Sequence, residues 1–159
     1  MEQVIKELIV DRRYDINSLE INENVYSVNH NTNKCIILNE MDTKIRKNNI
    51  VDVINEYELE DYDKLILILT SKLNNTKDIH PNIQIFIKPL INITKHKYVP
   101  KHTLLTTDEI TTLKDTGIEI NKLPLILRID PVIKWYDFKS GGVCKIIRSN
   151  QSIYHRLIK

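Results

Sequence analysis

The sequence contains no alanine and only three glycines, while isoleucine, asparagine and lysine are abundant. This bias is typical of genes rich in A/T codons, so the many asparagines are weak signals for turns or disorder. A glycine-rich phosphate loop is absent, because the only adjacent glycines are Gly141 and Gly142. Cysteine is also scarce. Cys35 and Cys144 lie far apart, which excludes a disulfide framework or the paired cysteines of a zinc ribbon.

Long apolar runs are missing as well. The longest uninterrupted one covers residues 65–69, far short of the ~18–20 residues that span a bilayer. The first residues are charged and mixed, which is unlike a signal peptide. We therefore expect an intracellular protein that contacts no membrane.

Charge divides the chain into two parts. Residues 1–94 carry 11 Lys/Arg and 15 Asp/Glu, a net charge of −4, whereas residues 95–159 carry 12 and 6, a net charge of +6. A change of sign near Thr94 predicts a domain boundary there.

The first part has the pattern of a small α/β unit with a mixed sheet. Val4, Ile5, Leu8 and Ile9 follow helical spacing. Residues 25–28 and 34–38 predict a hairpin, and residues 64–69 predict a strand buried on both faces. Residues 83–87 predict a further strand. Between these strands, Asp42 is a candidate helix cap, and Ile50, Val53, Ile54 and Tyr57 share one helical face.

The second part reads as a compact α+β unit. Thr106 and Glu109 fit a capping box, Ile110 and Leu113 supply the buried helix face, and Gly117 suits the helix end. A strand is predicted over residues 125–129. Asp130-Pro131 predicts a short second helix, ending near Tyr136. Residues 140–142 predict a turn, and residues 143–147 and 153–158 a closing pair of strands.

Catalytic patterns are weak. Asp42-Thr43-Lys44 and Asp137-Phe138-Lys139 each place an acid two residues before a lysine, as metal-dependent nucleases do. Those enzymes carry the pair on a central strand, whereas Asp42 is a candidate helix cap and Asp137 precedes a turn. His96 and His102 have no further ligands at metal-binding spacing. Both cysteines lie in apolar strands and read as core residues.

Four segments carry a family resemblance. They are residues 92–106 with Pro100-Lys101-His102, residues 123–136 with Asp130-Pro131-Val132 and Lys134-Trp135-Tyr136, residues 139–148 with Gly141-Gly142, and residues 155–158 with His155-Arg156. In order and spacing they resemble the assembly domain of the fifth-subunit family of multisubunit DNA-directed RNA polymerases, a family with archaeal as well as eukaryotic members.

The resemblance implies an α+β fold, with a shortened jaw-like domain of small mixed-sheet type at 1–92 and an assembly domain at 93–159. It implies a non-catalytic structural subunit that docks on the largest polymerase subunit, needs no cofactor, binds no small-molecule substrate and leaves nucleotidyl transfer to the complex. The implied docking residues are Pro100, Lys101, His102, Asp130, Pro131, Val132, Lys134, Tyr136, Lys139, Gly141, Lys145, Arg148 and Arg156. Of these, Lys134, Lys139, Lys145, Arg148 and Arg156 are expected to form a basic face.

The jaw of cellular members touches downstream DNA with a nuclease-like but non-catalytic fold. Lys44, Arg46 and Lys47 are candidate DNA contacts here, although the net charge of −4 argues against a strong grip. The sequence departs from the family at Asp137, where glycine is usual, and in a shorter loop before Arg156.

The compact jaw, the A/T-rich usage and the short loop favour a large DNA virus as source. A viral origin implies a virion or cytoplasmic viral factory as location, and a cellular one implies the nucleus. The alternative function is a stand-alone nucleic-acid-binding or nuclease-like protein.

Overall fold

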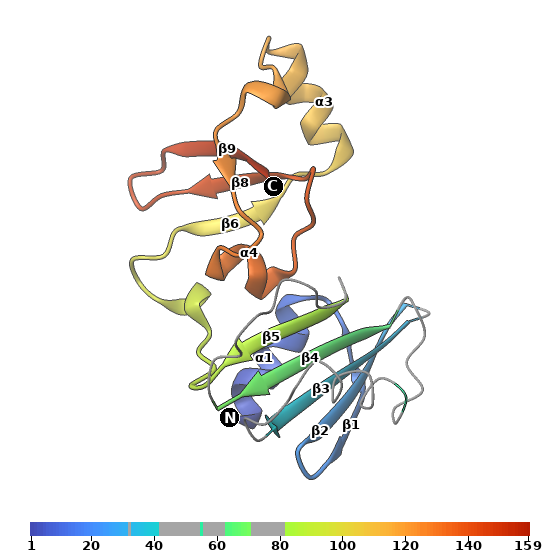
Figure 1. Ribbon diagram of the computed structural model, residues 1–159. Coiled ribbons are helices and arrows are strands. Elements are labelled where there is room, and N and C mark those ends of the chain that lie inside the picture. Colours follow the sequence, from blue (N-terminus) through green and yellow to red (C-terminus); the bar gives the residue numbers. More distant parts are fainter. Residues whose placement is uncertain (32, 42–54, 56–62, 71–81) are drawn as a thin grey trace. The chain divides into compact units, whose positions relative to one another are not determined.

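A computed structural model describes residues 1–31, 33–41, 55, 63–70 and 82–159. The chain divides into two compact units, Met1–Ile91 and Asn92–Lys159, called here the N-terminal and C-terminal units. Each contains helix and a mixed sheet, which confirms the α+β fold class (Figure 1). No helix within the described residues combines the length and apolar character needed to cross a membrane.

The N-terminal unit is a five-stranded mixed sheet with one described helix. Its strands follow the spatial order β1-β2-β3-β4-β5. The first three pair antiparallel, and β3, β4 and β5 pair parallel. The elements are α1 (Glu2–Asp11), β1 (Asp15–Asn22), β2 (Val25–His30), β3 (Asn33–Met41), β4 (Lys64–Leu69) and β5 (Ile83–Ile87).

Strand β4 lies in the core of this unit. Residues 65–69 are each at most 1% exposed, and β4 lies between two parallel neighbours. Removal of each such side chain from water contributes roughly 1.5–3 kcal/mol. The amphipathic α1 lies across one face of the sheet and buries Ile5, Leu8 and Ile9 (Figure 1). The predicted buried strand and the predicted N-terminal helix are therefore confirmed.

The predicted hairpin is confirmed with longer arms. The pair His30 and Asn33 closes β2 against β3, and Asn31, which follows β2, has a φ of 57°. Strand β1 was not predicted, because its residues are mostly exposed and show no apolar alternation. The predicted cap at Asp42 and the helical face of Ile50, Val53, Ile54 and Tyr57 lie outside the described residues.

The C-terminal unit is a four-stranded sheet in the order β6-β8-β9-β7. Strands β6 and β8, and β8 and β9, pair antiparallel, whereas β7 pairs parallel with β9. The elements are η1 (Ile93–Lys95), β6 (Lys101–Leu104), α3 (Thr107–Asp115), η2 (Ile120–Lys122), β7 (Leu125–Ile126), α4 (Pro131–Tyr136), β8 (Val143–Ile147) and β9 (Ile153–Ile158).

The core of this unit lies between α4 and one face of the sheet. Ile133 of α4 packs with Cys144, Ile146 and Ile158. Trp135 is buried to 1% exposure. Successive strand residues point to opposite faces, so the even-numbered residues of β8 face α4 and Val143, Lys145 and Ile147 face away.

Two expectations for this unit are corrected. The strand predicted over residues 125–129 is regular only at Leu125–Ile126, because Asp130 N–H donates to the carbonyl of Leu127 at 2.9 Å and begins a turn. The apolar face of α3 is half-buried, since Ile110 and Leu113 are neither fully covered nor exposed. The capping box is confirmed: Thr106 N–H donates to Glu109 Oε2 at 2.8 Å, and Glu109 N–H donates to Thr106 Oγ1 at 3.3 Å.

Candidate functional site

A histidine side chain stabilises the backbone at the start of β6. His102 Nδ1 donates to the carbonyl oxygen of Pro100 at 2.8 Å, and His102 itself is 9% exposed. Lys101 lies between them and is exposed. Of the three residues predicted to dock at this point, His102 fixes the backbone, whereas Lys101 is presented to solvent.

The Asp130-Pro131 pair starts α4 as its chemistry predicts. Asp130 Oδ1 accepts from Val132 N–H at 2.9 Å and from Ile133 N–H at 3.3 Å. Pro131 occupies the first turn, where its missing N–H costs nothing, and stays exposed. Val132 is 7% exposed and belongs to the core. Pro131 is thus the accessible member of this segment.

The end of α4 explains the aspartate at position 137. Asp137 ends the helix with φ 55° and ψ 37°, the left-handed region that glycine adopts most readily. Its carboxylate accepts from Lys139 Nζ at 2.9 Å. Tyr136 stacks on Phe138 with ring centroids 5.1 Å apart. Lys134 is half-buried on the same helix.

The turn after α4 contains two glycines in different settings. Gly141 has a φ of 86°, a conformation that L-residues rarely adopt. At Gly142, an added Cβ would lie 2.8 Å from Leu104 Cδ1 and 3.2 Å from the carbonyl oxygen of Lys139. Gly142 therefore permits a close approach of the turn to β6.

The five basic residues predicted to form one face lie on different sides of the sheet. Arg156 is paired with Cys144, so both face α4, whereas Lys145 points to the opposite face. Arg156 donates from Nη1 to the carbonyl of Leu125 at 3.0 Å. The Arg148 guanidinium lies 4.5 Å from the Tyr154 ring centroid. The structure places Lys134, on α4, on the side of Arg156.

Of the two nuclease-like patterns, the structure describes only Asp137-Phe138-Lys139. Asp137 binds Lys139 in a loop and is not on a strand, and Asp42 with Thr43 and Lys44 lies outside the described residues. Among the residues that the structure describes, no group of three or more His, Cys, Asp and Glu side chains forms a metal site. Burial raises the pKa of the Cys144 thiol to about 11, which keeps it protonated and unreactive near neutral pH.

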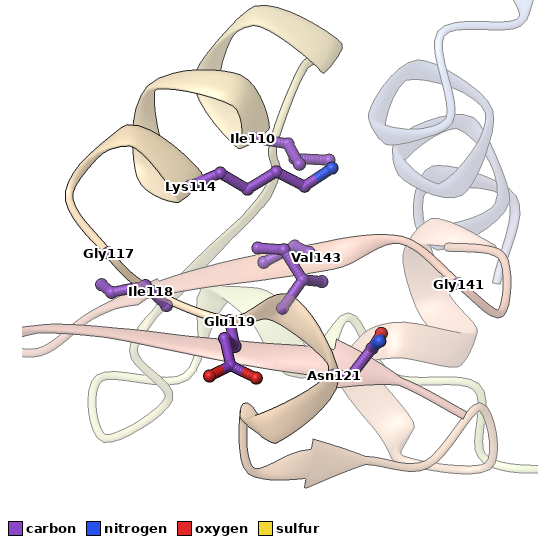
Figure 2. A pocket seen from close by; sticks show the side chains of 9 residues that line it. Ile110, Lys114, Gly117, Ile118, Glu119, Asn121, Gly141 and Val143 are labelled. Carbon is purple, nitrogen blue, oxygen red and sulfur yellow. The ribbon is translucent and has the colours of Figure 1, made fainter.

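A cleft of about 590 Å³ beneath α3 was missed by the sequence reasoning. Figure 2 shows Ile110 and Lys114 extending from α3 over Val143 of β8, with Glu119 from the following segment nearby. The lining is mainly apolar, with Lys114 and Glu119 as its charged members. The sequence feature that points to this cleft is the apolar face of α3. A single sequence does not show whether such a face is half-buried or fully packed.

Exposed apolar residues were also missed. Leu125 is 46% exposed, Leu127 52% and Ile129 79%. They are alternate residues of segment 125–129, for which the sequence predicts a strand. Tyr98, 77% exposed, lies in the basic segment that enters β6.

The C-terminal unit is a small α+β domain that presents lysines, arginines and apolar side chains to solvent. Residues 91–158 match the family model described as "RNA polymerase Rpb5, C-terminal domain". The chain belongs to this family of RNA polymerase subunits.

Named relatives come from archaea and eukaryotes. The "DNA-directed RNA polymerase subunit Rpo5" of Methanosphaera stadtmanae is 39% identical over 62 residues, covering 38% of this chain and 80% of the relative. The "DNA-directed RNA polymerases I, II, and III subunit rpabc1" of Dictyostelium discoideum is 41% identical over 64 residues, covering 40% of this chain and 32% of the relative.

One alignment reaches beyond the C-terminal unit. The RPABC1 subunit of Caenorhabditis briggsae is 26% identical over 131 residues, which cover 74% of this chain and 62% of the relative. The chain thus spans most of the archaeal relative's length but less than two thirds of these eukaryotic relatives.

Proposed function

We propose that this chain is a non-catalytic structural subunit of a DNA-directed RNA polymerase, and that its C-terminal unit docks on the largest subunit. The observation that carries this proposal is the agreement between the family match over residues 91–158 and the compact unit Asn92–Lys159. Nucleotide addition then belongs to the complex.

The accessible members of the predicted docking set support this role. Pro131, Lys101, Lys139 and Arg148 are exposed, although each lies in or beside a well-defined element. The Arg148 side chain is held over Tyr154, which reduces the rotamer entropy that docking would otherwise remove. We propose that these side chains contact the partner, and that His102, Asp130 and Gly141 fix the backbone that presents them.

The test uses the full chain and polymerase reconstituted without it. Combined Pro131→Ala and Arg148→Ala substitutions should weaken incorporation at least about tenfold. The isolated variant should unfold within about 1 kcal/mol of wild type, because both side chains are exposed. A control that combines Lys114→Ala and Lys122→Ala, outside the docking set, should incorporate normally. Normal incorporation of the Pro131/Arg148 variant would contradict the docking surface.

We further propose that the N-terminal unit acts as a shortened jaw whose Lys44, Arg46 and Lys47 contact downstream DNA. Support comes from the clustering of three cations within four residues of an otherwise acidic region. The contact is weak and salt-sensitive, because the region has a net charge of −4.

The kind of organism or virus that encodes this chain stays a prediction. The absence of alanine and the short turn at residues 149–152 between β8 and β9 favour a large DNA virus. In that case the polymerase acts in the virion or the cytoplasmic viral factory. The named relatives are archaeal and eukaryotic.

A further inference from the structure

The sheet of the C-terminal unit has two edge strands, and the β7 edge is closed by other groups. The carbonyl of Leu125 accepts from Arg156 Nη1 at 3.0 Å, and the carbonyl of Leu127 accepts from Asp130 N–H at 2.9 Å. Strand β7 is also only two residues long. Short length and engaged carbonyls are ways in which proteins block strand addition.

The β6 edge is different. Leu105 N–H donates to Val143 carbonyl at 2.9 Å, in the same register that pairs Thr103 with Lys145. In an antiparallel ladder, alternate residues bond the partner strand, so Lys101 and Thr103 bond β8. The N–H and C=O groups of His102 and Leu104 point outward, where the sheet order places no further strand among the described residues.

The side chains along this edge suit an extended ligand. Lys101 is exposed, Thr103 is half-buried, and Leu104 is 44% exposed. Lys145 lies beside Thr103 on the same face. A strand laid along β6 would thus meet an apolar contact on one face and lysines on the other.

The charge of the residues that lead into β6 indicates which kind of segment would bind along this edge. Residues 92–107 of the C-terminal unit contain no aspartate or glutamate, and they contain Lys95, Lys97 and Lys101. Lys97 lies over the Tyr98 ring, with Nζ 4.7 Å from its centroid. A segment rich in Asp and Glu is the complement of this stretch.

We propose that an extended acidic segment of the largest polymerase subunit adds to the C-terminal sheet as a fifth strand beside β6, bonding the outward backbone groups of His102 and Leu104. This proposal rests on the proposed function, because it specifies how the docking occurs. Strand addition supplies affinity through main-chain bonds, and side chains supply selectivity.

Amide hydrogen exchange on the unmodified full chain tests the edge directly. When polymerase reconstituted without this chain is added, the exchange of the His102 and Leu104 amides should slow at least about tenfold. The Lys101 and Thr103 amides serve as internal controls, because β8 protects them already. Binding without slower exchange at His102 and Leu104 overturns strand addition and leaves the docking intact. Absence of binding refutes the proposed function itself.

A pair of variants isolates one hydrogen bond. Leu104→Pro removes an outward N–H and breaks no bond to β8, a placement that edge strands tolerate. Leu104→Ala shortens the same side chain and keeps the N–H. Leu104→Pro should bind at least about tenfold more weakly than Leu104→Ala. Equal affinities would overturn the proposal, provided that the circular dichroism spectra of both variants match.

Charge reversal tests the acidic character of the segment. Lys101→Glu should weaken binding at low salt by about tenfold or more. Lys159→Glu reverses a charge at the end of β9, beside the opposite edge, and serves as the control with an effect below about threefold. Equal losses for the two variants would contradict an acidic strand at β6.

Discussion

Asp137 Oδ2 lies 2.9 Å from Lys139 Nζ, and the Asp137 backbone is left-handed at φ 55°. The ion pair therefore sits on a residue whose conformation favours glycine. Since the Asp137 side chain is 5% exposed and that of Lys139 59%, the pair is open to solvent on the lysine side. It ties the end of α4 to the turn that follows.

Two substitutions separate the backbone from the ion pair at this position. Asp137→Ala loses the pair and keeps a Cβ in the left-handed region, whereas Asp137→Gly loses the pair and removes the strain. The glycine variant should be more stable than the alanine variant by about 1 kcal/mol. Denaturant unfolding of the full chain, followed by fluorescence of Trp135, the single tryptophan, measures this difference. Equal stability would show that the helix end relaxes in solution.

The cap of α4 gives a second stability prediction. Asp130→Ala removes the acceptor for two backbone N–H groups and should destabilise the C-terminal unit by about 1 kcal/mol. Asp130→Asn keeps a capping oxygen and should lose less. The same Trp135 fluorescence measures both variants. A larger loss for asparagine than for alanine would mean that the negative charge has another role.

The capping box of α3 makes a pH prediction. The pKa of Glu109 is lowered from its ordinary 4.5, because Thr106 N–H donates to the carboxylate. A depressed carboxyl pKa stabilises the fold above the unfolded value and loses that contribution as pH falls through the folded one. The Thr106 amide resonance should therefore shift below pH 4.5. It should not shift in Glu109→Gln. A shift centred above 4.5 would contradict the capping box.

Thiol reactivity tests the burial of Cys35 and Cys144. Both side chains are buried, 1% and 0% exposed, and burial raises the pKa of Cys144 to about 11. At pH 8 a pKa of about 11 leaves only about one Cys144 in a thousand as the thiolate. Native chain should react with a thiol reagent at least about a hundredfold more slowly than urea-unfolded chain. Fast labelling of native chain would contradict the packing.

Salt dependence tests the proposed DNA contact. Replacement of Lys44, Arg46 and Lys47 by alanine in the assembled polymerase should lower the slope of log affinity against log salt, by up to about 3 for a downstream duplex. Removal of Lys114, Lys122 and Lys159 instead should leave that slope unchanged. An unaltered slope in the first variant would remove these residues from the DNA contact.

The sequence predicted elements whose cause is local. The Thr106–Glu109 box and the Asp130-Pro131 start are set by bonds within three residues, and β4 is set by a continuous apolar run. Strand β1 was missed because pairing with β2, rather than its own pattern, makes it a strand. Asp137 was noted as the acid of a nuclease-like pattern and as a departure from the family, and its left-handed backbone explains why the family usually has glycine there.

For the candidate site, sequence alone located the segments but not their faces. Lys145 and Arg156 belong to one predicted basic face, yet strand parity places them on opposite sides of the sheet. The side of the sheet that a strand residue faces depends on the register of its strand. That register is set by pairing with residues far away in the sequence. The open edge at β6 follows from the same register, so composition could not reveal it.

Affinity purification of the tagged chain from its native source, with mass spectrometric identification of the co-purifying subunits, tests the central claim most directly. The account predicts the largest polymerase subunit in equal stoichiometry with the tagged chain, together with template-directed RNA synthesis in the eluate. Recovery of the tagged chain free of any large polymerase subunit would contradict it.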